Sequence, residues 1–375
     1  MTPEVRAPES VDNAAEEAYF TASSWALMRR NLLKHRLAIL GGSVLALLYL
    51  TGAIAPGFFS AYDTLQRNND YILAPPQRIR VLHEGRPHRP FVYGLATTRD
   101  PETFRRIYAA DKEAVYPIRF LVRGADYKLF GFVPTNIRLL GVAEPGVLFL
   151  LGTDELGRDM YSRTLHGARI SLTIGLVGVA ISFILGCLLG GISGYFGGAA
   201  DMFIQRVIEF FSSIPTLPLW MALAAAVPTT WPPIRIYFMI TVILSIVGWT
   251  GLARVVRGKM LQLREEDYVL SAKISNTGEM RIIGKHLLPG FMTYLIVHLT
   301  LAVPSMILGE TALSFIGIGL RPPAVSWGVL LQQAQNIRSV ALSPWLLTPA
   351  LFVVATVLCF NFLGDGLRDA ADPYK

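Results

Sequence analysis

The chain has 375 residues, of which 52% are hydrophobic and only 16% are charged. Soluble globular domains carry about 25% charged residues, so this composition predicts an integral membrane protein. The formal net charge of +7 would suit a nucleic-acid partner, but no nucleic-acid-binding motif accompanies it. Inner-membrane proteins concentrate Lys and Arg in cytoplasmic loops, so we expect a lipid bilayer as the partner and no nucleic acid.

The chain begins with a polar tail and a first apolar run. Residues 1–28 show no apolar periodicity, which favours a cytoplasmic tail. A basic cluster at residues 29–36 precedes an apolar run at residues 37–55, which is long enough to cross a hydrocarbon core about 30 Å thick. Residues 29–56 are therefore the predicted first span, with the N-terminus inside. The alternative is a signal peptide cleaved after residue 55, but the length of the run favours an anchor.

Residues 57–150 form the longest polar region, which we expect to be an extracytoplasmic insertion between the first two spans. Runs at residues 79–82, 91–93 and 118–122 are typical of strands. Residues 100–114 predict a helix with a thin apolar face. Long loops are exempt from the positive-inside rule, so the many arginines of this region allow an outside location. We expect a small α+β subdomain, with a solvated linker as the alternative.

Further apolar runs predict five more spans, which lie at residues 170–195, 203–227, 236–253, 291–308 and 345–363. Pro215 and Pro218 are expected to bend the third span where neighbouring helices can satisfy the freed carbonyl groups. Six crossings return the chain to the cytoplasm, so both termini lie inside. The predicted fold is an all-α membrane protein of six transmembrane helices with an α+β insertion, in which residues 151–375 are a five-span core.

A charged loop at residues 254–289 interrupts the apolar runs. It follows the fourth span on the cytoplasmic side, where a basic loop belongs. Acidic residues at 265–267 favour a helix start because they complement the helix dipole. Asn276 and Gly278 favour a break, since both tolerate a left-handed backbone, and a second helix is expected at residues 280–287. The loop therefore predicts a cytoplasmic helix-turn-helix, and a generic amphipathic loop on lipid headgroups is the alternative.

No catalytic or metal-binding constellation appears in the sequence. Gly258-Lys259 and Gly284-Lys285 end like phosphate-binding loops, but the first Gly and the following Ser or Thr are missing. The six histidines have no metal-ligand spacing. We therefore expect a protein that is not an enzyme, with no catalytic residues, no metal site and no directly bound cofactor.

Residues 264–289 resemble the coupling loop of ATP-binding-cassette importer permeases. That pattern has Glu-Ala-Ala, three residues, Gly, and an Ile-x-x-x-His-x-Leu-Pro ending. Here Leu270-Ser271-Ala272 replace the first part, Asn276 replaces the Gly, and residues 282–289 match the ending. The loop is then expected to couple the permease to an ATPase, through Glu266, Asp267, Tyr268, Ala272, Asn276, Gly278, Ile282, His286 and Pro289.

Three further motifs resemble the second, C-type permease subunit of the peptide and nickel subfamily. They are Leu-Gly-Thr-Asp-Glu-Leu-Gly-Arg-Asp at residues 151–159 with Gly-Ala-Arg-Ile-Ser-Leu at 167–172, Glu-Thr-Ala-Leu-Ser-Phe at 310–315 with Ser-Trp-Gly at 326–328, and Leu-Gly-Asp-Gly-Leu-Arg-Asp at 363–369. The resemblance implies the fold of type I importer permeases. It also implies a second permease subunit, two ATPase subunits that carry ATP and Mg, and an extracytoplasmic solute-binding protein.

In related permeases an Ala-Pro-Pro stretch lies shortly before Leu-Gly-Thr-Asp, whereas residues 77–151 separate the two here. This segment is therefore expected either to dock the binding protein or to cap the permease pair. Glu310 ends an apolar run and is a candidate solute contact, because an acid within a span is unfavourable. Asp154, Arg158 and Asp159 are expected to hold the outer loop or to contact solute.

The sequence thus predicts an inner-membrane permease subunit of an ATP-driven importer of oligopeptides or similar solutes. Oligosaccharides and metal chelates remain open as cargo. One alternative is an ion-coupled secondary transporter, although the spans contain few of the buried ionisable residues that it requires. A membrane-anchored assembly protein, in which the insertion binds a partner, is the other alternative.

Overall fold

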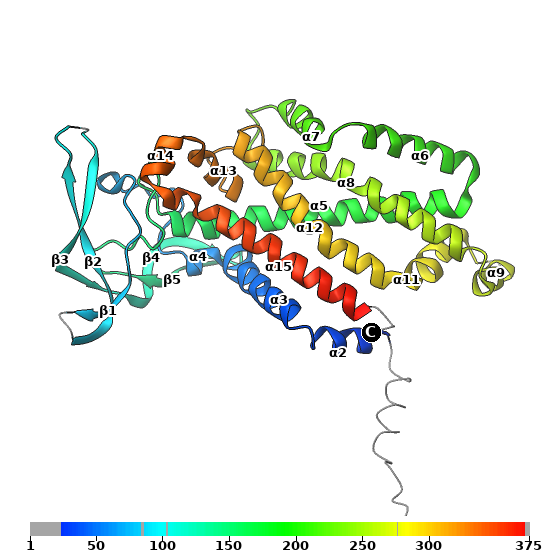
Figure 1. Ribbon diagram of the computed structural model, residues 1–375, viewed down its shortest axis with the longest axis horizontal. Coiled ribbons are helices and arrows are strands. Elements are labelled where there is room, and N and C mark those ends of the chain that lie inside the picture. The colour runs from blue at the N-terminus through cyan, green and yellow to red at the C-terminus, as the bar shows by residue number, and fades with distance from the viewer. Residues whose placement is uncertain (1–23, 84–85, 103, 276, 372–375) are drawn as a thin grey trace, which may run out of the picture.

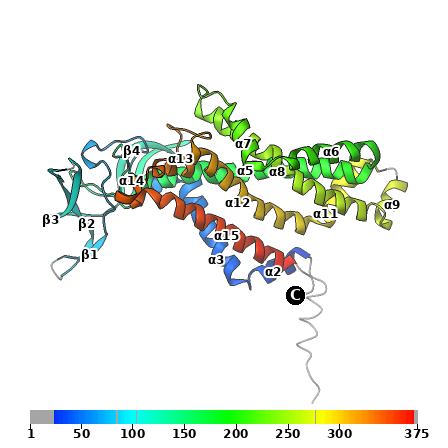
Figure 2. The same cartoon turned by 45° about the horizontal axis from the view of Figure 1, so that its top comes forward.

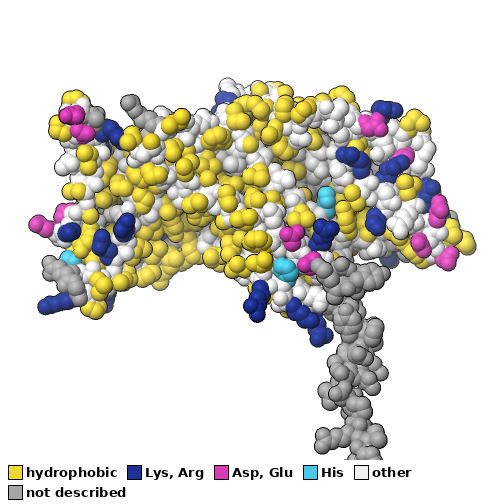
Figure 3. Space-filling view, in the orientation of Figure 1, with side chains coloured by type: hydrophobic (Ala, Val, Ile, Leu, Met, Phe, Trp, Pro, Cys, Tyr) yellow, Lys and Arg dark blue, Asp and Glu magenta, His cyan; other side chains and the backbone are white. Residues whose placement is uncertain are grey.

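The long helices run side by side, and the β-strands lie together at one end of them (Figure 1). The computed structural model describes residues 24–83, 86–102, 104–275 and 277–371. Figure 2 shows the same separation from a second direction, with α7 projecting from the other helices. Hydrophobic side chains cover the middle of the visible surface in Figure 3, and charged side chains gather toward its ends. This distribution is that of a protein whose middle lies in a bilayer.

Five helical segments of the described residues are long and apolar enough to cross a membrane. They are α3 (Arg36–Leu48) with the π-helix Tyr49–Ile54, α5 (Met160–Phe196), α8 (Pro233–Leu263), α12 (Met292–Ile316), and α15 (Thr348–Ala371) with the preceding 3₁₀ turn Pro344–Leu347. The helices α6 (Gly198–Ser213) and α7 (Thr216–Ala225) meet at 88° and together make a sixth, broken candidate. The break falls at Pro215, so the predicted bend of the third span is confirmed.

Helices α5 and α8 pack closely because glycines line their contact. A Cβ atom added at Gly190 would lie 2.5 Å from the carbonyl oxygen of Ala253. One added at Gly194 would lie 2.6 Å from the carbonyl oxygen of Arg257. Small residues of this kind let helix backbones approach each other inside a membrane. The glycine-rich second span of the sequence is therefore the central packing surface of the helical domain.

Several short helices complete the helical domain. They are α2 (Ser24–Leu32), α4 (Pro56–Phe59), the 3₁₀ turn Asn69–Tyr71, α9 (Asp267–Ile274), α10 (Glu279–Arg281), the π-helix Ile282–Leu287, α11 (Leu288–Gly290), α13 (Trp327–Gln332), the 3₁₀ turn Gln333–Gln335 and α14 (Ile337–Leu342). Helix α9 lies at the end of the molecule opposite the strands (Figure 1). Helix α2 contacts the last part of α15, and His35 Nε2 lies 3.9 Å from Asp369 Oδ2.

The insertion folds into two antiparallel sheets. Its strands are β1 (Arg80–His83), β2 (Arg86–Arg99), β3 (Arg106–Pro117), β4 (Arg119–Leu129) and β5 (Val133–Gly141). The first sheet has the order β1-β2-β3, and the second is the hairpin β4-β5. The strands predicted at residues 79–82, 91–93 and 118–122 overlap β1, β2 and β4.

The helix predicted at residues 100–114 is wrong, because β3 occupies most of this segment. Strand β3 pairs with β2 from Arg99↔Arg106 to Phe91↔Pro117. The predicted helix had only Phe104 and Ile107 on its apolar face, and both side chains are exposed. Such a helix would bury too little surface to be stable. The described residues of 57–150 contain the five strands and, as helix, only the end of α4 and the 3₁₀ turn Asn69–Tyr71, so the expected α+β subdomain is mainly β.

Arg138 of β5 joins the insertion to the chain that leaves the first span. Its guanidinium is buried and donates hydrogen bonds to Ser60 Oγ at 2.7 Å and to the carbonyl oxygen of Tyr62 at 3.0 Å. It also donates to the carbonyl oxygen of Ala125 at 3.3 Å and lies over the ring of Tyr127. Because these acceptors belong to both parts of the chain, the β4-β5 hairpin is fixed to the helical domain.

Candidate functional site

Helix α9 forms where the acidic residues of the charged loop predict a helix start. Glu266 caps the helix with an extended backbone, and its carbonyl oxygen accepts bonds from Val269 N and Leu270 N. Asp267 lies in the first turn and Lys273 in the last, and both placements suit the helix dipole. The first helix of the predicted helix-turn-helix is thus confirmed.

The inner face of α9 packs on the ends of the transmembrane helices. Val269 is completely buried and Ala272 partly buried in an apolar cluster with Tyr195 of α5 and Met260 of α8. Lys273 Nζ lies 5.1 Å from the centre of the Tyr195 ring, which adds a cation–π contact. Helix α9 therefore has a fixed position against the domain even though it is only eight residues long.

The outer face of α9 consists of Asp267, Leu270, Ser271 and Ile274, which share one side of the helix at spacings of three and four residues. All four are exposed; Leu270 is 45% and Ile274 87% accessible. Sequence reasoning did not assign a role to Ile274. Leu270, which replaces the acidic residue of the family pattern, lies beside Ile274 and makes this face partly apolar. Tyr268 is exposed next to it.

The second half of the loop is also helical, but its hydrogen bonding is irregular. α10, the π-helix and α11 follow one another up to Gly290. Ile282 and Leu287 of the π-helix are fully buried in the same cluster as Val269, and Pro289 lies in α11. Gly278 has φ −58° and ψ 138°, so the expected left-handed backbone is absent at this residue. Asn276 and the side chain of His286 lie outside the described residues.

A cavity lies beside the loop, between the ends of α8, α12 and α15. Its volume is 1280 Å³, and its lining residues include Lys259, Phe291, Tyr294, His298, Asp365 and Arg368. Phe291 belongs both to this wall and to the cluster under α9. Phe291, at the start of α12, therefore connects the cluster under α9 with the wall of the cavity.

Glu310 lies in the other half of α12 and is fully buried within the chain. Its carboxylate accepts hydrogen bonds from Ser171 Oγ of α5 at 3.0 Å and from Ser314 Oγ at 2.8 Å. Ser171 Oγ in turn accepts a bond from the backbone N–H of Trp327 at 3.2 Å. Glu310 thus connects α12, α5 and α13, and in this conformation it lies among hydroxyl groups of its own chain.

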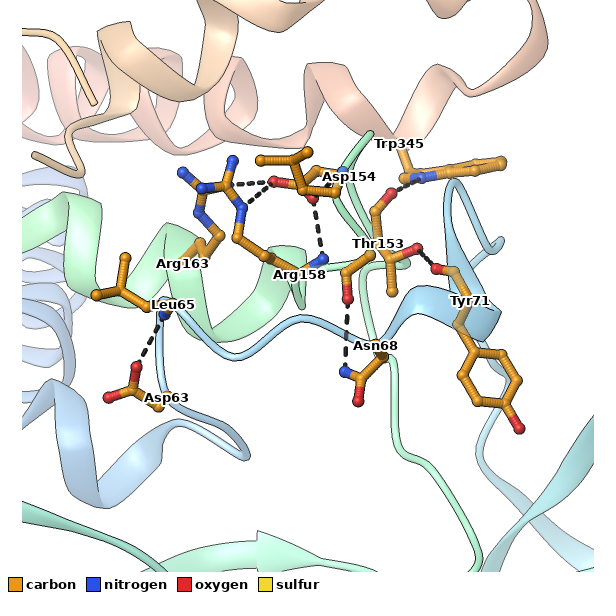
Figure 4. Close-up of polar contacts among 11 residues, drawn as sticks. Asp63, Leu65, Asn68, Tyr71, Thr153, Asp154, Arg158, Arg163 and Trp345 are labelled. Atoms are coloured by element: carbon orange, nitrogen blue, oxygen red, sulfur yellow. Dashed lines mark hydrogen bonds and ion pairs between the residues drawn. The ribbon is translucent and has the colours of Figure 1, made fainter. Parts of the chain in front are cut away.

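The outer loop is held by a buried ion cluster around Asp154 (Figure 4). The Asp154 carboxylate pairs with Arg158 at 2.8 Å and also with Arg163. The neighbouring Thr153 accepts a hydrogen bond from Trp345 Nε1 at its carbonyl oxygen and receives one from the backbone N–H of Ala74 at its hydroxyl, at 2.7 Å. Asp154 and Arg158 therefore fix the fold of the loop. Arg163 was not identified from the sequence.

Asp159 caps α5. Its carboxylate accepts hydrogen bonds from the backbone N–H and the hydroxyl of Ser162, at 2.8 and 2.6 Å. Burial raises the pKa of the Asp159 carboxyl to about 6. All three outer-loop residues singled out from the sequence are buried structural groups in this conformation. Among the described residues, no group of three or more His, Cys, Asp or Glu side chains could hold a metal ion.

Two family profiles match this sequence. Residues 182–374 match the profile described as binding-protein-dependent transport system inner membrane component. Residues 23–76 match the N-terminal TM domain of oligopeptide transport permease C. The chain belongs to the binding-protein-dependent transport permeases. This permease is a multi-pass, non-enzymatic subunit of an ATP-binding-cassette transporter, in which ATP hydrolysis lies with partner subunits.

Curated relatives support the C-type assignment. The permease is 42% identical over 224 residues to the dipeptide transport system permease protein DppC of Bacillus subtilis, covering 59% of this chain and 68% of that protein. It is 41% identical over 223 residues to the oligopeptide transport system permease protein OppC of Haemophilus influenzae, covering 59% and 69%. These findings favour an ATP-driven permease over both alternatives, the ion-coupled transporter and the assembly protein.

A solved structure of the inward-facing MetNI methionine ABC transporter is a more distant likeness. It has a TM-score of 0.45 at 18% identity and covers 56% of this permease and 97% of that chain, too little to add to the argument. The two profiles leave residues 77–181 unmatched. All five β-strands fall in this gap.

Proposed function

We propose that this permease is the C-type subunit of an importer that moves oligopeptides or similar solutes from an extracytoplasmic binding protein into the cytoplasm. The names of the relatives DppC and OppC support this class of cargo. The proposed assembly contains a second permease subunit, two ATPase subunits that bind ATP and Mg, and the binding protein.

The outer face of α9 is the proposed contact with an ATPase subunit. The observation that carries this proposal is the division of α9 into a buried face, which fixes its position, and an exposed face with Leu270 and Ile274. Exposed apolar side chains ringed by charge are typical of protein–protein contacts. Glu266, Asp267 and Tyr268 supply the polar part of this contact. Leu270 makes its centre apolar where the family pattern has an acid.

Motion of α9 would reach the transport path through α12. Val269, Leu287 and Phe291 belong to one packed cluster, and α12 continues from it toward Glu310. Packed helices move as nearly rigid bodies, so a shift at α9 is passed along the span. In this proposal Glu310 acts by holding α12 to α5 and α13, instead of as a direct solute contact.

The proposed topology places α9 and both termini in the cytoplasm of the cell whose inner membrane holds the permease. The positive-inside rule supports it, because Arg254, Arg257 and Lys259 lie beside α9. The insertion at residues 77–151 then lies outside, at the opposite end of the helices (Figure 1). Exposed arginines on its strands, such as Arg86 and Arg89, would suit an acidic surface of the binding protein.

Substitution of Ile274 tests the proposed function. The permease is reconstituted with its partners in liposomes, and ATP hydrolysis stimulated by the solute-loaded binding protein is measured. We expect Ile274→Asp to reduce the stimulated rate about tenfold or more, because it places a charge in an apolar contact. Ile337→Asp is the matched control, since Ile337 is 85% exposed at the far end. Stimulation of the Ile274→Asp variant equal to that of the unsubstituted permease would refute the docking role of α9.

A further inference from the structure

The tip of the β4-β5 hairpin carries two exposed aromatic rings. Phe130 is 50% and Phe132 74% accessible, and their ring centres lie 6.3 Å apart. Val133 and Ile137 of β5 are also exposed, and strand alternation turns both away from the buried Arg138. The hairpin thus carries exposed apolar side chains at its tip and on β5 that no described part of the chain covers.

The packing of the hairpin on the chain after the first span determines its height relative to the membrane. A Cβ atom added at Gly57 would lie 2.3 Å from the Tyr127 ring, so the hairpin packs directly on Gly57. Gly57 follows the end of the first candidate span at Ile54 by three residues. Tyr127 pairs with Thr135, only two register positions before the end of the ladder at Leu129↔Val133. The hairpin therefore begins its final turn beside the outer end of the first span.

The tip itself reaches further along the helices. A Cβ atom at Gly131, between the two rings, would lie 3.7 Å from an Nη atom of Arg169 in α5. The neighbouring Ala168 contacts Gly52, where an added Cβ would lie 2.4 Å away. Gly52 belongs to the first candidate span. The tip therefore lies level with the last turn of that span, at the boundary between outer water and hydrocarbon.

The exposed surface of α5 continues from this level into the membrane. Arg169 is exposed, and the following exposed positions of the helix include Leu176, Val177 and Ile184. Leu176 is seven residues beyond Arg169, which corresponds to about 10 Å along a helix. The aromatic tip thus lies about 10 Å along α5 from the exposed apolar side chains of that helix.

We propose that the β4-β5 hairpin is a lipid anchor, with Phe130 and Phe132 inserted in the outer interfacial layer of the bilayer. Aromatic rings are enriched at this depth. Exposed Lys128 and Arg169 flank the tip, and basic side chains extend from apolar surfaces toward lipid phosphates. The anchor would fix the insertion against the membrane while Arg138 fixes it to the chain that leaves the first span. A protein partner over the tip is the competing explanation.

Spin labelling of the assembled transporter tests this proposal. Single cysteines are placed at Phe132 and, as the control, at Phe104, which is 79% exposed between β2 and β3. The buried native Cys187 and Cys359 are replaced by Ala. In lipid nanodiscs, collision of each label with oxygen, which concentrates in lipid, is compared with collision with a water-soluble nickel chelate. We expect an oxygen-to-nickel ratio several-fold higher at position 132 than at position 104.

Two results would overturn the anchor. A ratio at position 132 equal to that at position 104 would show a tip in water. Low collision rates with both reagents would show a tip covered by protein, as expected for contact with the second permease or the binding protein. The measurement is repeated with a single cysteine at Phe130. The tip can then still be tested if the Phe132→Cys variant assembles poorly.

Discussion

The guanidinium of Arg138 is buried, and its hydrogen bonds to the described residues go to no carboxylate. Its hydrogen bonds go to carbonyl and hydroxyl oxygens, including those of Ser60 and Tyr62. Burial lowers the pKa of its guanidinium, but an arginine side chain keeps its charge in proteins. Removal of the side chain would leave several buried oxygens unpaired, and each such loss is unfavourable.

We predict that Arg138→Met loosens the insertion by about 2 kcal/mol. Proteolysis within the insertion should become about 30-fold faster, because the open population rises by that factor. Cleavage of the purified permease by a protease in limiting amount measures the change. Arg123→Met, at an exposed position of the same hairpin, is the control and should leave the rate unchanged. Equal rates for both variants would contradict the role of Arg138.

The sequence identified Asp154, Arg158 and Asp159 but could not separate a structural role from solute contact. That distinction depends on Arg163, which lies one turn into α5 and pairs with Asp154. The sequence contains many arginines, and no local pattern marks this one as the partner. The role of Glu310 could not be predicted for the same reason. Its carboxylate bonds to Ser171, which is 139 positions away in the chain, and Ser171 bonds to the backbone of Trp327.

At the scale of elements, close packing of α5 and α8 depends on glycines whose neighbours are backbone atoms. A contact at 2.5 Å from an added Cβ cannot be relieved by a side-chain rotation. Gly251 of α8 is different, because an added Cβ would meet nothing within 4 Å. The two positions therefore separate the steric effect of a methyl group from its effect on helix propensity.

We predict that Gly190→Ala lowers the yield of folded permease, by a destabilisation of about 1–3 kcal/mol from overpacking. Gly251→Ala should be neutral or slightly stabilising, since Ala is the better helix former. Size-exclusion profiles and thermal unfolding of both variants in the same detergent check this difference. A normal profile and unfolding temperature for Gly190→Ala would show that the helices can separate without loss.

The sequence predicted the long apolar helices well, because their length and composition leave few other structures. The insertion was harder. The composition of residues 106–117 favours neither a helix nor a strand strongly. They form a strand because they pair with β2. Helix α9 has two apolar pairs, Val269 with Ala272 and Leu270 with Ile274. Only the packing against Met260 and Leu287 reveals that the first pair is buried.

For the whole molecule, one continuous set of contacts leads from the charged loop to the half of the helical domain that lies nearer the strands. It begins under α9 at Val269 and Phe291, follows α12, and ends at Glu310 with Ser171. The insertion is attached separately, through Arg138. In the proposed mechanism, energy input belongs to the end of the molecule that carries α9, and solute delivery to the end that carries the strands.

The central claim is that the outer face of α9 contacts the ATPase subunit. A photo-crosslinking amino acid is placed at Ile274, and at Ile337 as the control, in the assembled transporter. The account predicts a crosslink to the ATPase subunit from position 274 and none from position 337. A crosslink from position 337 to the ATPase, or an assembled and active transporter with no crosslink from position 274, would contradict it.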